Sequence, residues 1–144
     1  MLRLTKKSEY GLMALAYMAQ NNSLTSAKDI VEELGMPRRL LTEVLKELSR
    51  QKVVTGITGP KGGYRLERCA SKITLCEIVE ALEGPLSFVD CAEGGECDRS
   101  PSCLIQSGVK KIATDIRHLL TNVTLAEVAL GDSAHQSLID TIAV

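Results

Sequence analysis

Three evenly spaced cysteines are the residues of this chain whose types and spacing are best suited to chemistry. Cys91, Cys97 and Cys103 form a C-x5-C-x5-C pattern, separated by Ala, Glu, Gly, Asp, Arg, Ser and Pro. This composition predicts a flexible loop that can wrap three thiolates around one centre. Iron–sulfur clusters are held by cysteine thiolates, and zinc also accepts three cysteines with one further ligand. The pattern therefore indicates a metal or cluster site, against the alternative of three unrelated surface thiols.

The remaining cysteines and histidines do not extend this pattern. Cys76 lies in a predicted helix as a small core residue, and Cys69 has no assigned role. His118 and His135 lack metal-ligand spacing with the cysteines. An odd total of five cysteines, three of them clustered, favours metal or redox chemistry over a disulfide framework in a cytosolic protein.

Composition and charge narrow the class of protein. The 144 residues include one Phe, three Tyr and no Trp, so the core must be aliphatic, as is typical of helical proteins. The N-terminal apolar run is too short to span a membrane and has no cleavage site, so we expect a cytoplasmic protein without a membrane segment. Neither a Ser-His-Asp set nor a phosphate loop is present, so we do not expect an enzyme.

The net charge is distributed unevenly along the chain. It is +5 through residue 68 and −6 from residue 69 onward, which is typical of a nucleic-acid-binding first half.

The first half has the pattern of a winged helix-turn-helix. Apolar residues at three- and four-residue spacing predict helices that start after Thr5, at Ser26 and at Pro37. A Gly-containing turn joins the second and third helices, as in helix-turn-helix motifs. A β-branched run at 52–57, a Gly-rich turn at 59–63 and a return strand then predict a hairpin wing.

The second half predicts helices around the cysteine loop. A capping box at Thr74 opens a helix to about Glu83, and Ser100-Pro101 opens a long helix to about Leu120. Cys103 would then lie in the first turn of the long helix, where the helix dipole favours a thiolate. A second capping box at Thr124 opens a short helix to Leu130.

The predicted fold is mainly α, a winged helix-turn-helix with a β-hairpin wing, a cysteine loop and a long C-terminal helix. We expect a DNA-binding domain at 1–68, a connecting helix and cysteine loop at 69–100, the long and short helices at 101–130, and a tail at 131–144. Side chains at the N-terminal end of a recognition helix reach base edges in the major groove, and glycines at a wing tip allow close approach to DNA. The candidate DNA contacts are Arg38, Arg39, Thr42, Lys46, Thr58, Lys61 and Tyr64.

The sequence resembles the Rrf-type winged-helix regulators, the family of IscR, NsrR, RirA and CymR. The matching segments are LTKKSEYGLMALAYMA, LGMPRRLLTEVLKELSRQKVV, the wing GPKGGYRL, CEIVEALEG, the cysteine pattern and HLLTNVTLAEV. This resemblance covers nearly the whole chain. It implies double-stranded DNA with a palindromic operator as the partner, and a homodimer held by the long helix. It also implies an iron–sulfur cluster, 2Fe–2S or 4Fe–4S, on the three cysteines.

Two departures from the family concern ligands and DNA contacts. Gln106 stands where the IscR-like branch has a His ligand, three residues after the last cysteine. In the NsrR-like branch an acidic residue of the other subunit completes the site, and Glu9 matches that position. Glu9 is equally well explained as a carboxylate that complements the first helix's dipole. The recognition residues Arg38, Arg39 and Thr42 also differ from the IscR-like ones, so the operator sequence does not transfer.

The expected function is a transcription regulator whose operator binding is controlled by a cluster that senses iron, redox state or nitric oxide, or that reports on cluster assembly. One alternative is a cluster-free regulator of the same fold that uses its thiols. A second is a cluster carrier or electron-transfer protein, which the winged helix disfavours.

Overall fold

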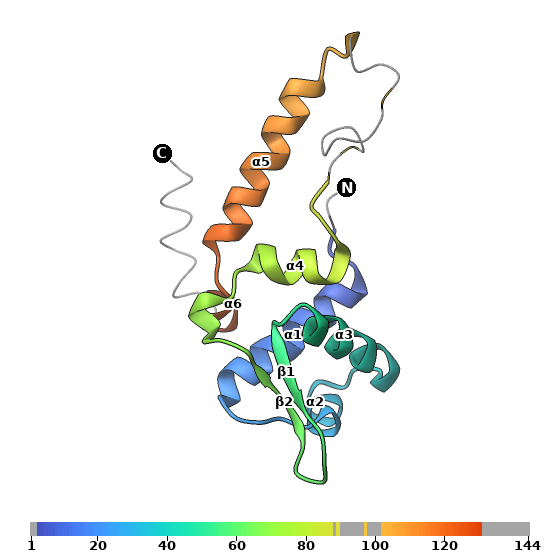
Figure 1. Cartoon of the computed structure of the whole chain (residues 1–144), viewed down its shortest axis with the longest axis vertical. Coiled ribbons are helices and arrows are strands. Elements are labelled where there is room, and N and C mark those ends of the chain that lie inside the picture. Colours follow the sequence, from blue (N-terminus) through green and yellow to red (C-terminus); the bar gives the residue numbers. More distant parts are fainter. Residues whose placement is uncertain (1–2, 88, 90–96, 98–101, 131–144) are drawn as a thin grey trace.

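The winged-helix body is built from the elements that the sequence predicts. A computed structural model describes residues 3–87, 89, 97 and 102–130. The body begins with three helices, α1 (Lys6–Asn21), α2 (Ala27–Leu34) and α3 (Arg38–Arg50). An antiparallel hairpin follows, made of β1 (Val54–Ile57) and β2 (Gly63–Leu66), in which Val54 pairs with Leu66 and Ile57 with Gly63. Figure 1 shows this hairpin projecting from the helices as a wing, so the predicted winged-helix fold is confirmed.

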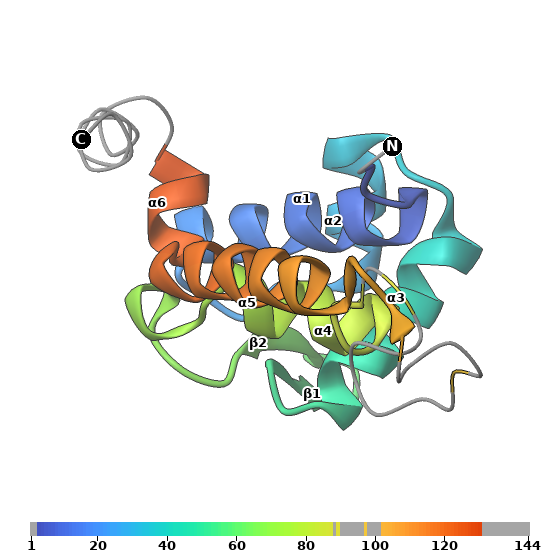
Figure 2. The same ribbon diagram turned by 90° about the horizontal axis from the view of Figure 1, so that it is seen from above.

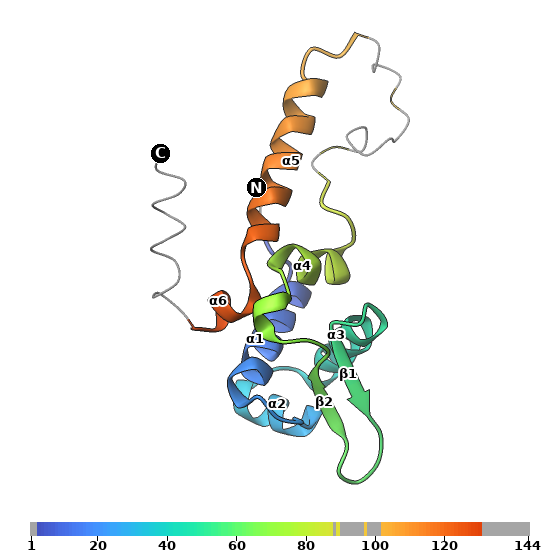
Figure 3. The same ribbon diagram turned by 60° about the vertical axis from the view of Figure 1, so that its left-hand side comes forward.

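The later elements fold back onto this body. A short 3-10 turn, η1 (Ala70–Lys72), leads into α4 (Leu75–Glu83), and α6 (Leu125–Leu130) returns to pack near α1. The Leu125 N–H donates to the Ile73 carbonyl at 2.8 Å, which fastens the start of α6 beside the start of α4. Figure 3 shows α6 beside α1, whereas α5 (Gln106–Asn122) extends away from the body.

Side-chain caps start the helices where the sequence places them. Thr5, Ser26 and Thr74 each accept a hydrogen bond from a backbone N–H of the first helical turn. Pro37 is the N-cap of α3, one residue before the helix, where the sequence pattern predicted it as the first helical residue. These local interactions explain the agreement between the predicted and observed helices of the body.

One aliphatic core holds the body together. Its fully buried large side chains come from α1, α2 and α3, from β1, from α4 and the residues just before these two elements, and from the start of α6. Burial of such side chains contributes about 1.5–3 kcal/mol each to folding. The largest are Leu15, Met18, Ile30, Leu41, Leu45, Leu48, Ile73, Ile78 and Leu125. The core therefore includes residues from both sides of position 68. The domain boundary expected at residue 68 is thus a proposal about function and does not separate two cores.

The predicted start of the long helix is wrong. Helix α5 begins at Gln106, so Cys103 precedes it and does not lie in its first turn. Ser and Cys are weak helix formers, and Leu104 is 97% exposed, so no packing compensates for ordering a further turn. The dipole argument for a Cys103 thiolate within that turn therefore does not apply. Pro101 and the tail from residue 131 lie outside the described residues.

Candidate nucleic-acid interface and cysteine site

The outer face of α3 presents the cations expected to contact DNA. Leu41, Val44, Leu45 and Leu48 turn the opposite face into the core. The Arg39 side chain is 94% exposed, and its nearest carboxylate is that of Glu43 at 3.6 Å. The Thr42 hydroxyl donates to the Arg38 carbonyl at 2.9 Å, and Thr42 remains exposed on the same face. Within the described part of the chain, Arg38 and Lys46 form no ion pair, so this face is available to a polyanion.

The wing continues this surface. A hollow of about 260 Å³ lies between α3 and the hairpin, lined by residues that include Lys46, Ser49, Thr58 and Tyr64. Thr58 and Lys61 are exposed at the tip of the wing. Tyr64 is half-buried against the core and bridges to Thr25 through two backbone hydrogen bonds of 2.8 and 2.9 Å. Tyr64 therefore fixes the wing to the body as well as facing the hollow.

Two wing glycines are required by close approach within the chain. A Cβ on Gly62 would lie 2.1 Å from the Ile57 carbonyl oxygen, and a Cβ on Gly63 would lie 2.6 Å from the Thr25 carbonyl oxygen. Both obstacles are backbone atoms, which cannot rotate away. The sequence reasoning explained these glycines by approach to DNA, whereas the structure gives them an internal role in closing the hairpin.

The cysteine pattern is only partly within the described residues. Cys97 and Cys103 are free thiols of intermediate exposure, and Cys91 lies outside the described residues. Among the described residues, which leave out Cys91, no three metal-ligand side chains lie close enough together to hold a metal ion. Cys76 is 4% exposed in the core, as predicted, and Cys69 is exposed after the wing. The two described thiols of the pattern are therefore unpaired and accessible.

Glu9 lies in the first turn of α1. Its carboxylate pairs with Lys6 at 2.5 Å, and this hydrogen bond raises the pKa of the Lys6 ammonium. A carboxylate in a first helical turn also complements the helix dipole. Gln106 is the first residue of α5.

A junction between α1 and α4 was not predicted from the sequence. The Thr5 and Ser8 hydroxyls both donate to Oε1 of Glu83, and the Lys7 ammonium donates to the Leu82 carbonyl at 2.9 Å. We call these five residues the α1–α4 junction. Partial burial alone would raise the pKa of Glu83, but the hydrogen bonds from Ser8 and Thr5 and the nearby Lys7 charge lower it below its ordinary value. Only the Thr5 cap gave a signal in the sequence.

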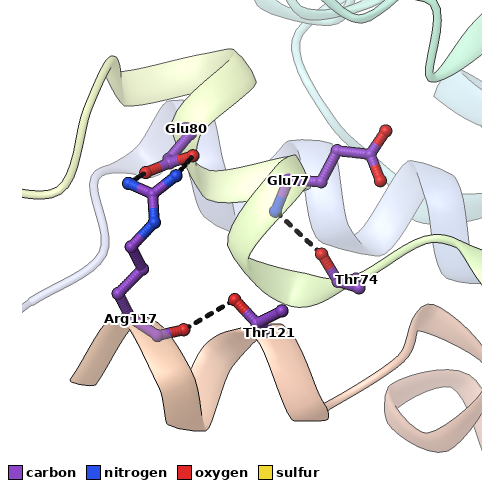
Figure 4. Close-up of polar contacts among 5 residues, drawn as sticks. All are labelled: Thr74, Glu77, Glu80, Arg117 and Thr121. Atoms are coloured by element: carbon purple, nitrogen blue, oxygen red, sulfur yellow. Dashed lines mark hydrogen bonds and ion pairs between the residues drawn. The ribbon is translucent and has the colours of Figure 1, made fainter. Parts of the chain in front are cut away.

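An ion pair connects α5 to α4. The Arg117 guanidinium donates twice to the Glu80 carboxylate, and Figure 4 shows the two side chains meeting across a gap between the helices. A hollow of about 350 Å³ lies beside the pair and also involves Thr74, Glu77 and Thr121. The Glu77 carboxylate pairs with Arg68, so the predicted capping box at Thr74 is only half formed.

The long helix leaves an apolar face uncovered in the single chain. No residue of α5 is buried, and Ile112 and Leu119 are 51% and 42% exposed. Figure 2 shows α5 passing over α4. Of the predicted apolar seam, Leu104, Ile112 and Leu119 are exposed, and Val109, Ile116 and Leu120 are only partly buried by the chain's own residues. Among the described residues, no helix combines the length and apolar character needed to cross a membrane.

Comparisons with known proteins agree with this geometry. A family model described as Rrf2, an iron-dependent transcriptional regulator, matches residues 4–130. The global cysteine regulator CymR (YrzC) of B. subtilis is 28% identical, with a TM-score of 0.72, and the match covers 92% of this chain and 99% of that chain. T. potens IscR is 27% identical, with a TM-score of 0.68 and coverages of 88% and 85%. Staphylococcus aureus CymR is 26% identical, with a TM-score of 0.65 and coverages of 87% and 96%.

Proposed function

The chain belongs to the Rrf2 family of transcriptional regulators, and we propose that an iron–sulfur cluster on its cysteine segment controls its binding to an operator. The observation that carries this proposal is the pair of free, accessible thiols of Cys97 and Cys103, spaced as the sequence pattern requires. The iron-dependent character of the matching family model supports it.

DNA recognition follows from the shape and charge of one surface. The N-terminal end of α3 fits the major groove, where Arg38 and Arg39 can hydrogen-bond bidentately to guanine or to phosphate. Thr42 and Lys46 lie further along the same face. Thr58 and Lys61 extend the contact from the wing to the adjacent backbone or minor groove. We propose that these residues, with Tyr64 holding the wing in place, form the operator interface.

A second copy of the chain is the proposed partner of α5. The exposed apolar side chains of this helix lie in a stripe that an equivalent helix can cover. Two copies related by a two-fold axis would present two α3 helices to a duplex, so the operator would be palindromic.

The donor set fits an iron–sulfur cluster chemically. Cys91, Cys97 and Cys103 offer three thiolates, and Glu9 of the partner subunit offers a carboxylate oxygen as the fourth ligand. A bound cluster would supply a centre that changes with redox state and iron supply, and an oxygen ligand in place of a fourth thiolate makes such a centre more labile. In a dimer, the cysteine segment of one subunit would then meet the first turn of the partner's α1, and cluster binding would set the position of that helix relative to the DNA-reading helix.

A regulator that uses its thiols without a cluster is the second candidate. Accessible, unpaired Cys97 and Cys103 favour this alternative as well, because thiolate chemistry requires access. Similar structures include CymR from Staphylococcus aureus in an oxidized form. Oxidation of two thiols to a disulfide by a peroxide, which takes up the two electrons and two protons and is reduced to water or an alcohol, would then replace cluster loading as the signal.

Anaerobic purification separates the two candidates. We expect the wild-type protein to absorb visible light, to contain iron and sulfide, and to lose both in Cys97→Ala. The matched control is Cys69→Ala, which removes an exposed cysteine outside the pattern and should keep the iron. Operator binding, measured with a duplex selected from random sequence, should change on cluster loss in the wild type. A wild-type protein that stays colourless and iron-free after reconstitution would exclude the cluster.

A further inference from the structure

The α1–α4 junction lies at the point where the chain leaves the body toward the cysteines. Thr5 and Ser8 donate to one oxygen of Glu83, although these residues are 75 or more positions away in sequence. Ser8 has no exposed surface, so its hydroxyl is held in place between the helices. Figure 1 shows the beginning of α1 beside the end of α4, from which the chain continues toward the cysteine segment.

Packing beside the junction continues from α4 through α1 to the DNA-reading helix. A Cβ on Gly11 of α1 would lie 2.4 Å from the Leu82 side chain of α4 and 3.4 Å from the Val44 side chain of α3. Gly11 therefore lies where the three helices meet, with no space for a side chain. Val44 is fully buried on the inner face of α3 and is closely packed. A shift of α1 against α4 would therefore displace α3.

We infer that Glu83 is the positioning residue that transmits the state of the cysteine segment to α1, and through Gly11 and Val44 to the DNA-reading helix. Glu83 is the last residue of α4, and Gly84 follows it with a φ of 86°, so the junction lies at the end of the helix that precedes the cysteine segment. This inference rests on the proposed control of DNA binding by the cysteine segment. The inference identifies the α1–α4 junction as the part of the structure through which that control reaches α3.

The chemistry of the junction suits such a role. Two hydroxyls share a single carboxylate oxygen, so a small displacement of the end of α4 weakens both hydrogen bonds together. The Lys7 contact to the Leu82 carbonyl adds a third link to the same helix end. Two sites are coupled through an element that has two arrangements, and in this inference the junction is closed in one state of the cysteine segment and open in the other.

Amide hydrogen exchange of the full-length protein tests the inference. Exchange in the first turn of α1 is compared between the anaerobically reconstituted protein and the same protein stripped of iron with a chelator. We expect wild-type protection there to differ at least threefold between the two states. Glu83→Gln should raise exchange in this turn about tenfold, because a neutral amide oxygen accepts hydrogen bonds more weakly than a carboxylate, and should abolish the difference between states. Ser8→Ala, which leaves Glu83 intact, should reduce that difference.

The matched control is Glu77→Gln, which neutralises another carboxylate of α4. Glu77 pairs with Arg68, and none of its hydrogen bonds or ion pairs to described residues involves the junction, so this variant should keep the wild-type difference between states. A merely structural role for Glu83 would raise exchange equally in both states and leave their ratio unchanged. That ratio is therefore the decisive readout.

Failure of the inference is distinguishable from failure of the proposed cluster. If the wild type takes up no iron, the cluster is excluded, and the same comparison is made between reduced thiols and thiols oxidised with diamide. A state-dependent difference that Glu83→Gln abolishes supports the inference in either case. A difference that persists in Glu83→Gln, or no difference in the wild type under both pairs of states, overturns it.

Discussion

Arg117 of α5 donates two hydrogen bonds to the Glu80 carboxylate of α4, one of them 3.1 Å long. This ion pair joins two segments that lie on either side of the cysteine pattern in sequence. No residue of α5 is fully buried in the single chain, so this ion pair supplements a contact between α4 and α5 that is only partly buried. We therefore expect the pairing of these two side chains to help to hold α5 in its position against α4.

Removing this ion pair should loosen α5. We expect Arg117→Ala to raise amide exchange along α5 and to lower the free energy of unfolding by about 1 kcal/mol, since the pair is bidentate but partly exposed. The control is Lys111→Ala, which breaks the exposed pair with Asp115 inside the same helix and should have a smaller effect. Equal exchange in the two variants would show that Glu80 does not hold α5.

Acid should weaken the α1–α4 junction. The folded-state pKa of Glu83 is lowered, so its contribution to stability is complete above the unfolded-state pKa and is lost as the pH falls through the folded value. The urea midpoint of the wild type should therefore fall between pH 5 and about pH 3, and Glu83→Gln should fall less over this range. Glu47→Gln is the control, because Glu47 also has a lowered pKa but pairs with Arg50 on an exposed surface.

The exposed guanidinium at the start of α3 should contribute to DNA affinity. Arg39→Ala should weaken binding to a selected duplex about tenfold and, if Arg39 contacts a phosphate, reduce the slope of log K against log salt by about one. The loose pair with Glu43, at 3.6 Å, costs little to break. Fluorescence anisotropy at several salt concentrations measures both quantities.

Arg50→Ala provides the comparison for Arg39, since Arg50 ends the same helix and is held by Glu47 at 2.5 Å. It should leave affinity and salt slope nearly unchanged. If both variants lose affinity equally, the loss reflects net charge rather than contact by the N-terminal end of α3.

Short-range rules account for the parts of the fold that were predicted correctly. Thr5, Ser26 and Thr124 start helices through hydrogen bonds to residues only three positions away, so the sequence pattern contains the whole interaction. The hairpin follows for the same reason, because its turn is closed by neighbouring glycines. At Thr74 a more distant partner, Arg68, takes the Glu77 carboxylate, and the local rule holds only in part.

Long-range pairing accounts for what was missed. Glu83 is 75 positions from Ser8, and Arg117 is 37 positions from Glu80, so no periodicity relates them. The start of α5 was misplaced because Ser100-Pro101 is a favourable local signal, while nothing packs against Leu104 to sustain a helix there. Assignment of Cys91, Cys97, Cys103 and Glu9 as ligands remains a prediction.

The wing tip should tolerate no side chain at Gly62. A methyl group there would lie 2.1 Å from the Ile57 carbonyl oxygen and 3.0 Å from that of Gly59, so the turn must open and the 3.0 Å hydrogen bond from Gly62 N–H to Gly59 is lost. We expect Gly62→Ala to lower the free energy of unfolding by about 1–3 kcal/mol, as overpacking does. It should also weaken DNA binding, because Lys61 is displaced.

Two further variants separate strain from charge at the wing. Gly108→Ala introduces the same methyl group into helix α5, where no atom lies within 4 Å, and should leave the unfolding midpoint unchanged or raised. Lys61→Ala removes the charge without strain, so it should reduce DNA affinity and leave the midpoint unchanged. Since the obstacle at Gly62 is backbone, a Gly62→Ala protein with wild-type midpoint and affinity would mean that the wing is not closed as described and does not meet the duplex.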